Sequence, residues 1–343
     1  MTEDREGLIA PEMTDDRRPK KDSGPFGSSD NGHRSSVIGH RVLCLLLITM
    51  AVVVSACSPI LKQMTVSSAT EIFRDGQATF YREGDLRLAE QALASNLKLL
   101  EVLLQTSPDN QELLLLASQG FGAYTFAFVE EKVATHRTDP QLSSLHRERA
   151  RRLYLRGRNY GLRILKLRHE SFATAFDADL PAFWEALHVF QKEDVPALFW
   201  TAYGWAGSIN WSRTRPEMVV ELPRAVAMMH RALELDEEYF HAGPHLFFGI
   251  YYASRSPALG GEPSRAKAHL DRALDLTGGK FLLVQLLIAD PYAVQIQNRA
   301  LFETQLRLIL DTPDDLFPEQ RLMNQVAKAR ARLLLERIDE LFL

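Results

Sequence analysis

Apolar residues recur at three- and four-residue spacing along nearly all of residues 66–343, whereas alternating runs of β-branched residues are almost absent. This spacing places apolar side chains on one face of a helix, and a half-buried strand would need strict alternation instead. Turn-forming Pro, Gly, Asp and Asn residues interrupt the pattern at intervals. The sequence therefore predicts an all-α fold of about twelve helices. Their predicted ranges are 66–82, 86–106, 108–132, 141–169, 179–191, 194–209, 217–235, 238–254, 263–276, 279–288, 291–310 and 317–342.

Two of the interruptions indicate how the helices after them begin. Ser107 precedes Pro108, and Thr312 precedes Pro313. A Ser or Thr side chain can cap a helix by accepting hydrogen bonds from its first N–H groups. Proline fits the first turn because its missing N–H would have no partner there. We therefore expect Ser107 and Thr312 to be N-caps.

Two of the predicted helices share an internal spacing of small and large residues. Residues 225–236 carry Ala, Met and Ala where residues 266–277 carry Ala, Leu and Ala, and each run continues as Leu, an acidic residue and Leu. The preceding helices hold parts of the tetratricopeptide pattern, namely Trp200, Tyr203 and Gly204 in one and Gly249 and Tyr252 in the other. We expect an array of helical hairpins with cryptic tetratricopeptide-like repeats. An ordinary helical bundle with an alanine-rich seam is the alternative.

The N-terminal region has the pattern of a secretion signal. A basic flank ending at Arg41 precedes an apolar run over residues 42–54, and Ala56 stands directly before Cys57. The run is too short for a membrane-spanning helix, which needs about 20 apolar residues. A cysteine after small residues is typical of the bacterial lipobox, where the thiol is acylated and the signal is removed. A plain signal peptide or a one-pass anchor is the alternative.

This pattern predicts how the chain is organised. Residues 1–56 are expected to be a polar N-terminal extension plus a lipoprotein signal peptide, which is removed. Residues 57–65 are then a lipidated tether, and residues 66–343 a single α-helical domain. We expect a periplasmic protein anchored to the membrane through Cys57. Because Ser58 rather than Asp follows the cysteine, the outer membrane is favoured over the inner one.

Composition and motifs exclude several classes of function. A formal net charge of −4 does not favour nucleic-acid binding, and Cys44 and Cys57 are the two cysteines of the chain. Cys44 lies in the signal and Cys57 would be lipidated, so the folded part has no thiol for catalysis or metal binding. His241 and His245 have metal-ligand spacing, but Pro244 lies between them and no third ligand is evident. We expect no catalytic residue, no metal and no cofactor.

Five stretches of the mature chain resemble the T-component family of TRAP transporters. They are residues 113–130, 149–163, 197–207, 259–261 leading into 266–273, and 324–343. The resemblance implies an α-helical protein with cryptic tetratricopeptide motifs that forms a trimer with a tunnel or pore. It also implies that the protein associates with a TRAP-type periplasmic substrate-binding protein and binds an apolar or amphipathic organic ligand. A tetratricopeptide scaffold lipoprotein for cell-envelope assembly, which binds only protein, is the alternative.

Aromatic side chains concentrate on three of the predicted helices and could line such a tunnel. The candidate tunnel residues are Phe121, Tyr124, Trp200, Tyr203, Trp205, Asn210, Trp211, Phe247 and Tyr251. Aromatic residues on repeat helices also fill cores, and for any single member of this set core packing is the favoured interpretation.

The helix predicted over residues 141–169 is rich in arginine. Ala150, Tyr154, Gly157, Gly161 and Ile164 lie on one face of it and are expected to pack against a close neighbour. The arginines fall on the remaining faces. The candidate docking residues for an acidic partner protein are Arg152, Arg156 and Arg163. A solvated or salt-bridged face is the favoured alternative.

Overall fold

The computed structural model describes residues 66–212 and 214–342. The chain divides into two units, Met1–Pro59 and Ile60–Leu343, and the described residues belong to the second. The predicted signal segment, Cys57 and the tether over residues 57–65 lie outside the described residues.

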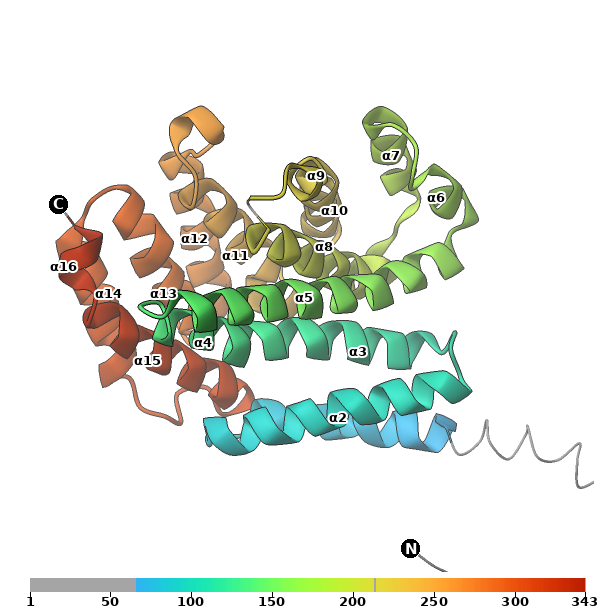
Figure 1. Cartoon of the computed structure of the whole chain (residues 1–343), viewed down its shortest axis with the longest axis horizontal. Coiled ribbons are helices and arrows are strands. Elements are labelled where there is room, and N and C mark those ends of the chain that lie inside the picture. Colours follow the sequence, from blue (N-terminus) through green and yellow to red (C-terminus); the bar gives the residue numbers. More distant parts are fainter. Residues whose placement is uncertain (1–65, 213, 343) are drawn as a thin grey trace, which may run out of the picture. The chain divides into compact units, whose positions relative to one another are not determined.

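The described residues form helices joined by turns, with no strand among them (Figure 1). This confirms the predicted all-α fold. A first helix covers residues 66–81. The longer helices that follow are α2 (Leu86–Thr106), α3 (Gln111–Tyr124), α5 (Pro140–Arg168), α8 (Val195–Asn210), α10 (Leu222–Leu235), α11 (Tyr239–Ala253), α12 (Pro263–Thr277), α14 (Arg299–Asp311) and α15 (Arg321–Leu335). The short α-helices are α4 (Glu130–Thr135), α6 (Glu170–Ala175), α7 (Leu180–Ala186), α9 (Pro216–Val219), α13 (Leu283–Leu287) and α16 (Ile338–Leu341). The 3-10 and π-helical turns are η1 (Thr125–Val129), η2 (Leu187–Val189), η3 (Lys192–Asp194), η4 (Pro257–Leu259), η5 (Ile288–Ala293) and η6 (Pro318–Gln320).

Asp and Asn side chains cap several of these helices. The side chain of Asn110 accepts from the backbone N–H groups of Glu112 and Leu113 and so begins α3. The prediction that Ser107 is an N-cap is therefore wrong, because Ser107 ends α2 and donates its backbone N–H to Leu103. The prediction for Thr312 is wrong for the same reason. Its N–H closes the last turn of α14 on the carbonyl of Leu308.

Helix α5 lies between α3 and α8 and packs closely on both (Figure 1). A Cβ atom on Gly161 would lie 2.3 Å from Thr201 Oγ1, and one on Gly204 of α8 would lie 2.8 Å from the carbonyl oxygen of Tyr154. At such distances a neighbouring atom would have to shift, so a side chain at either position would strain the contact between the two helices. The packing face predicted for this helix is buried along its length.

The two runs of similar spacing lie in α10 and α12. Their shared small and large positions are buried. A Cβ atom on Gly249 of α11 would lie 2.7 Å from Leu270 Cδ2 of α12, which shows how closely this helix pair approaches. Neighbouring helices therefore pack against each other where helical hairpins were expected. The assignment of these helix pairs to tetratricopeptide-like repeats stays a prediction. The segment between α8 and α10 holds α9, and the segment between α11 and α12 holds η4.

Buried apolar side chains form two clusters. The amino-terminal cluster is built chiefly by α2, α3, α5, α8 and α10, and the carboxyl-terminal cluster by α11 to α15. Helix α15 contributes to both, because Leu322 and Val326 join the first cluster while Met323 and Ala327 join the second. The last long helix of the chain thus connects the two parts of the core.

Candidate functional site

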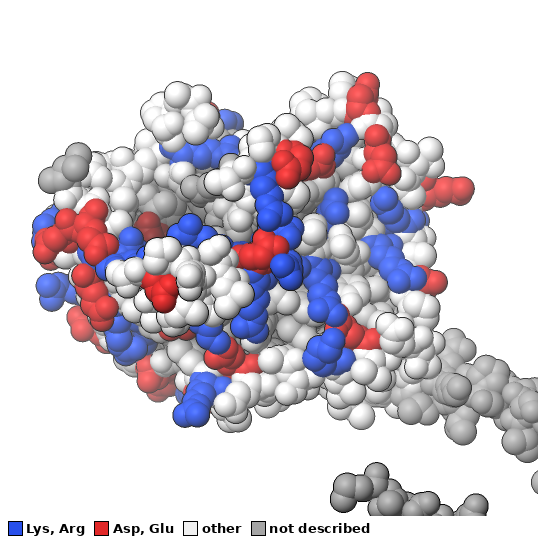
Figure 2. All heavy atoms as spheres, in the orientation of Figure 1, with Lys and Arg blue, Asp and Glu red and all other residues white. Residues whose placement is uncertain are grey.

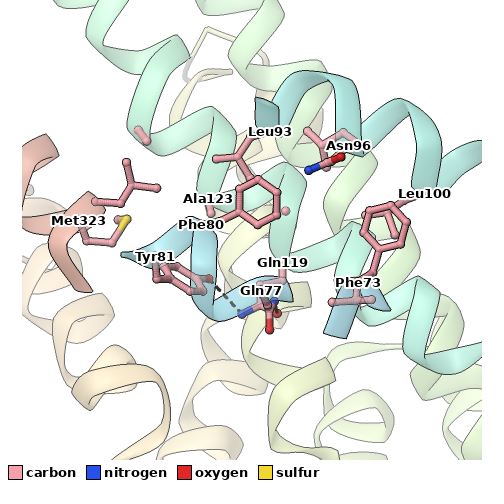
Figure 3. A pocket seen from close by; sticks show the side chains of 15 residues that line it. Phe73, Gln77, Phe80, Tyr81, Leu93, Asn96, Leu100, Gln119, Ala123 and Met323 are labelled. Atoms are coloured by element: carbon pink, nitrogen blue, oxygen red, sulfur yellow. Dashed lines mark hydrogen bonds between the residues drawn. The ribbon is translucent and has the colours of Figure 1, made fainter. Parts of the chain in front are cut away.

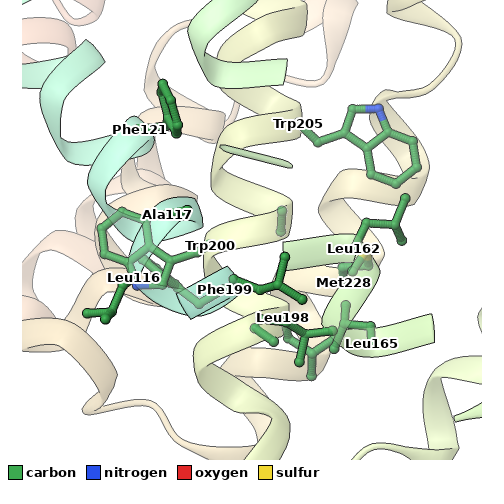
Figure 4. Packing of buried hydrophobic residues seen from close by; sticks show 14 of the residues in the cluster. Leu116, Ala117, Phe121, Leu162, Leu165, Leu198, Phe199, Trp200, Trp205 and Met228 are labelled. Carbon is green, nitrogen blue, oxygen red and sulfur yellow. The ribbon is translucent and has the colours of Figure 1, made fainter. Parts of the chain in front are cut away.

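The aromatic residues predicted to line a tunnel occupy several different places. Phe121, Tyr124, Trp200 and Trp205 are 1–4% exposed and pack within the amino-terminal cluster. Figure 4 shows Phe121, Trp200 and Trp205 in this cluster. Trp200 also donates its indole N–H to the Tyr239 hydroxyl at 3.1 Å. These four side chains contribute to the stability of the core.

The remaining members are less buried. Tyr203, Trp211, Phe247 and Tyr251 are partly exposed, and Asn210 is exposed at the end of α8. Phe247 and Tyr251 lie one turn apart on α11, with stacked rings 6.4 Å apart between centroids. The candidate tunnel residues therefore lie in three different places, namely the apolar core, a polar network and an open groove.

The polar network centres on the carboxylate of Glu130. Its Oε1 accepts from the Tyr154 hydroxyl at 2.7 Å and from Trp211 Nε1 at 3.1 Å, and its Oε2 pairs with Arg330 at 3.1 Å. Arg330 also hydrogen-bonds the carbonyl of Phe126 and lies 3.9 Å from the centre of that ring. Glu130 directly follows the π-helical turn η1, a feature often found at functional sites. This network joins α4, α5, α8 and α15.

The open groove has three walls. Elements α7 and η2 form one wall, α9 and α10 form another, and the end of α11 forms the third. The groove has a volume of about 570 Å³, within the usual range for small-molecule sites. Val219, Leu222 and Val226 supply apolar surface on one side, and Trp184 faces the groove from α7. Tyr251, one of the predicted tunnel residues, lines it from α11.

Arg255 provides a cationic group at this groove. Its guanidinium carbon lies 3.9 Å from the centre of the Tyr251 ring, and it forms no ion pair with a carboxylate in the part of the chain that the structure describes. A cation held over an aromatic ring is oriented by it and keeps its hydrogen-bond donors available. Arg231, a second lining arginine, is paired with Glu234 at 3.0 Å. The groove therefore combines apolar walls with the oriented guanidinium of Arg255 and a neutralised Arg231–Glu234 pair.

Sequence reasoning missed Trp184, Val219 and Arg255. Trp184 is 48% exposed and Val219 40% exposed, and both line the groove. The available signal was a second apolar row at residues 219, 222 and 226, whose spacing follows one helical face. The repeat pattern drew attention to the opposite face of α10, which is buried.

The docking residues predicted on α5 share one face with Arg149. We call Arg149, Arg152, Arg156 and Arg163 the arginine stripe, and Figure 2 shows basic side chains gathered over α5. Arg152 pairs with Glu148 at 2.8 Å, Arg156 pairs with Glu101, and Arg163 pairs with Asp109 at 2.8 Å. Hydrogen bonds from Arg151 and Arg152 lower the pKa of Glu148 to about 2. The stripe is therefore exposed but partly neutralised.

The two histidines considered as metal ligands have different neighbours. The His241 ring contacts Phe281 and Phe317, whereas His245 contacts His269 through Nδ1 at 2.9 Å and Glu237 through Nε2 at 2.9 Å. Within residues 66–212 and 214–342, no three His, Cys, Asp or Glu side chains gather as a metal site would require.

The histidine pair makes stability depend on pH. Burial, followed by the nearby His245, Arg265 and His230, lowers the pKa of His269 to about 4. The unfolded chain binds this proton near pH 6.5, so falling pH favours unfolding between pH 6.5 and 4. From pH 6.5 to 5 we expect wild type to lose about 1 kcal/mol more free energy of unfolding than His269→Gln, after allowance for solvent screening. Urea denaturation at both pH values measures this, and parallel losses in the two proteins would contradict it.

One described helical run is long and apolar enough to cross a membrane. It is Gln111–Thr135, which comprises α3, η1 and α4, and 67% of its most apolar window is buried inside the fold. This burial is the environment of a core helix, in agreement with its position beside α5.

The fold is thus that of an all-helical protein with a ligand-sized groove between helix pairs. The family model of the TRAP transporter T-component matches residues 82–342, and the chain belongs to this family. The chain is also similar to an uncharacterized protein of Treponema pallidum (strain Nichols), with 25% identity over 272 residues, which is 78% of this chain and 84% of that protein. As a T-component it belongs to a transport accessory family, not an enzyme family, and to a TRAP transport system of the cell envelope.

Proposed function

We propose that this protein is a lipid-anchored periplasmic accessory subunit that binds an apolar or amphipathic organic ligand and docks with the TRAP-type substrate-binding protein. Membership of the T-component family carries the transport assignment. A homotrimer and a ligand tunnel, both implied by the family resemblance, are part of this proposal.

The groove is the ligand site that the geometry supports best. Its volume of about 570 Å³ suits a small organic molecule. The row of Val219, Leu222 and Val226 would contact the apolar part of the ligand, and the Arg255 guanidinium would hold a polar or anionic end. An amphipathic ligand satisfies both features at once.

Acylation of Cys57 would hold this domain near the membrane surface. If fully extended, a segment of the length of residues 57–65 would span about 30 Å from end to end. More than one acyl chain would make membrane attachment stable. The proposed location is the periplasmic face of the outer membrane.

Docking is proposed at the arginine stripe, and charge reversal tests it. Arg152 and Arg163 are 71% and 47% exposed and pair with Glu148 and Asp109 at the surface. Arg152→Glu with Arg163→Glu should weaken association with the TRAP-type binding protein of the same organism at least tenfold at low ionic strength, and less at high salt, where charges are screened. Isothermal titration calorimetry at two salt concentrations measures the effect.

The control carries the same change of charge elsewhere on the surface. Lys267→Glu with Arg307→Glu reverses two exposed cations on α12 and α14 and should leave the affinity within twofold. Equal weakening by both double variants would refute docking at the stripe. A wild-type protein that binds no TRAP-type binding protein would refute the transport proposal and favour the envelope scaffold.

A further inference from the structure

The outward side of α2 carries apolar side chains that stay exposed within the described residues. Leu88, Leu99 and Val102 are 53%, 48% and 61% exposed. Their spacing of eleven and then three residues places them on one face of the helix, and Ser95, also exposed, lies between them on that face. We call these four residues the α2 face. Together with the first helix, α2 forms one edge of the domain (Figure 1).

The charged side chains that border the α2 face are cations or are neutralised. Along α2, whose residues are all described, the exposed charged side chains are those of Arg87 and Lys98. The two carboxylates of this helix are less exposed and paired, Glu90 with Lys132 and Glu101 with Lys98. The helix therefore presents apolar and cationic groups to its surroundings without an exposed carboxylate.

The first helix begins near the last turns of α2. Phe73 of the first helix lies beside Leu100 of α2 (Figure 3). Phe80, further along the first helix, lies beside Leu93, which comes earlier in α2 (Figure 3). The two helices therefore run antiparallel, and Val66 at the start of the first helix lies at the end of the hairpin where α2 finishes.

We propose that the α2 face rests on the surface of a phospholipid bilayer and so fixes the orientation of the anchored domain. This inference goes beyond the proposed function and rests on one part of it, the lipid anchor at Cys57. Cys57 lies nine residues before Val66, and a segment of that length spans about 30 Å when fully extended. Acyl chains on Cys57 would therefore keep this end of the helical hairpin close to the membrane.

The anchor makes a weak contact surface sufficient. Once the protein is anchored, contact between the α2 face and the bilayer is intramolecular and takes place at a high effective concentration. The three apolar side chains would enter the boundary between head groups and acyl chains. Arg87 and Lys98 would remain among the phosphates, where anionic lipids attract them. The chemistry of the face and the position of the anchor therefore agree on a lipid surface.

The test places a fluorophore on the α2 face of the acylated protein, in which the introduced cysteine is the free thiol. Ser95→Cys carries the label, and Thr304→Cys on α14 is the matched control, because both hydroxyls are exposed and donate to the carbonyl four residues earlier. The protein is anchored in vesicles of phosphatidylethanolamine and phosphatidylglycerol that contain a spin-labelled phospholipid as quencher. Quenching should be at least threefold stronger at position 95 than at position 304. Equal quenching would overturn the proposal.

Two double variants test whether the apolar side chains make the contact. Leu99→Asp with Val102→Asp should lower the quenching at position 95 at least twofold, because carboxylates resist desolvation and are repelled by anionic head groups. Leu308→Asp with Leu316→Asp adds the same charge at exposed apolar positions outside the α2 face and should leave the quenching unchanged. Losses of equal size in both double variants would show that net charge, and not the α2 face, controls the contact.

Flotation of the vesicles separates this proposal from the anchor on which it rests. A protein that does not float with the vesicles would refute the anchor and the membrane contact together. A protein that floats but shows no quenching at position 95 would refute the membrane contact alone. A blue-shifted emission at position 95 without quenching would show that protein, such as a second copy of this chain, covers the α2 face, and would also overturn the proposal. The proposals for the groove and the arginine stripe use no residue of the α2 face and stand in each case.

Discussion

Glu130→Leu should lower the free energy of unfolding by about 3 kcal/mol, since it leaves a largely buried cation without its carboxylate. The side chains of Arg330 and Glu130 are 20% and 18% exposed. The change also removes the acceptor for the Tyr154 hydroxyl and the Trp211 indole N–H. Urea denaturation followed by circular dichroism measures the loss.

A double variant and a surface control separate charge burial from other causes. Glu130→Leu with Arg330→Met should recover a substantial part of the loss, because the unpaired cation is then absent. Glu303→Leu breaks the exposed pair with Arg299 and should cost less than about 1 kcal/mol. Losses of equal size in Glu130→Leu and Glu303→Leu would show that the network does not stabilise the fold.

Gly204→Ala should destabilise the protein by about 1–3 kcal/mol although it adds a single methyl group. The new Cβ would lie 2.8 Å from the carbonyl oxygen of Tyr154 and 3.0 Å from the backbone nitrogen of Arg158. Both atoms belong to the backbone of α5, so the strain can be relieved only by separating α5 from α8. A lowered urea midpoint with an unchanged slope measures this effect.

Gly76→Ala provides the matched control. Gly76 lies in the helix over residues 66–81, and nothing outside the adjoining backbone of that helix lies within 4 Å of its ideal Cβ position. Alanine there should stabilise the protein by about 0.5–1 kcal/mol, because glycine weakens a helix interior. If both alanine variants changed stability in the same direction, close packing at Gly204 would not explain the result.

Much of the helical architecture could be predicted because helix periodicity and packing act through local spacing. The predicted range 86–106 matches α2, and the small-residue face predicted for α5 is the one that packs against α3 and α8. Errors arose where two local signals competed. Asn110 caps α3 in preference to Ser107 because its side chain reaches two backbone N–H groups of that helix.

The candidate site could be predicted only in part, because apolar residues look alike whether they face a core or a groove. Helix α10 has apolar residues on two sides, and Ala225 and Met229 are buried while Leu222 and Val226 line the groove. The start of α11 was also beyond prediction. Phe240, His241 and Ala242 have positive φ angles, which non-glycine residues rarely adopt. Tertiary contacts decide both features, and a single sequence does not display them.

The position of α15 in the core has a consequence for how the chain is made. Leu322 and Val326 complete a cluster whose other members begin at Val66. During synthesis the amino-terminal helices therefore emerge long before the segment that covers them. A chain cut short before Arg321 loses the cover of its earliest helices as well as its own end. The residues of α15, which are synthesised late, thus complete the packing that protects the first helices from proteolysis.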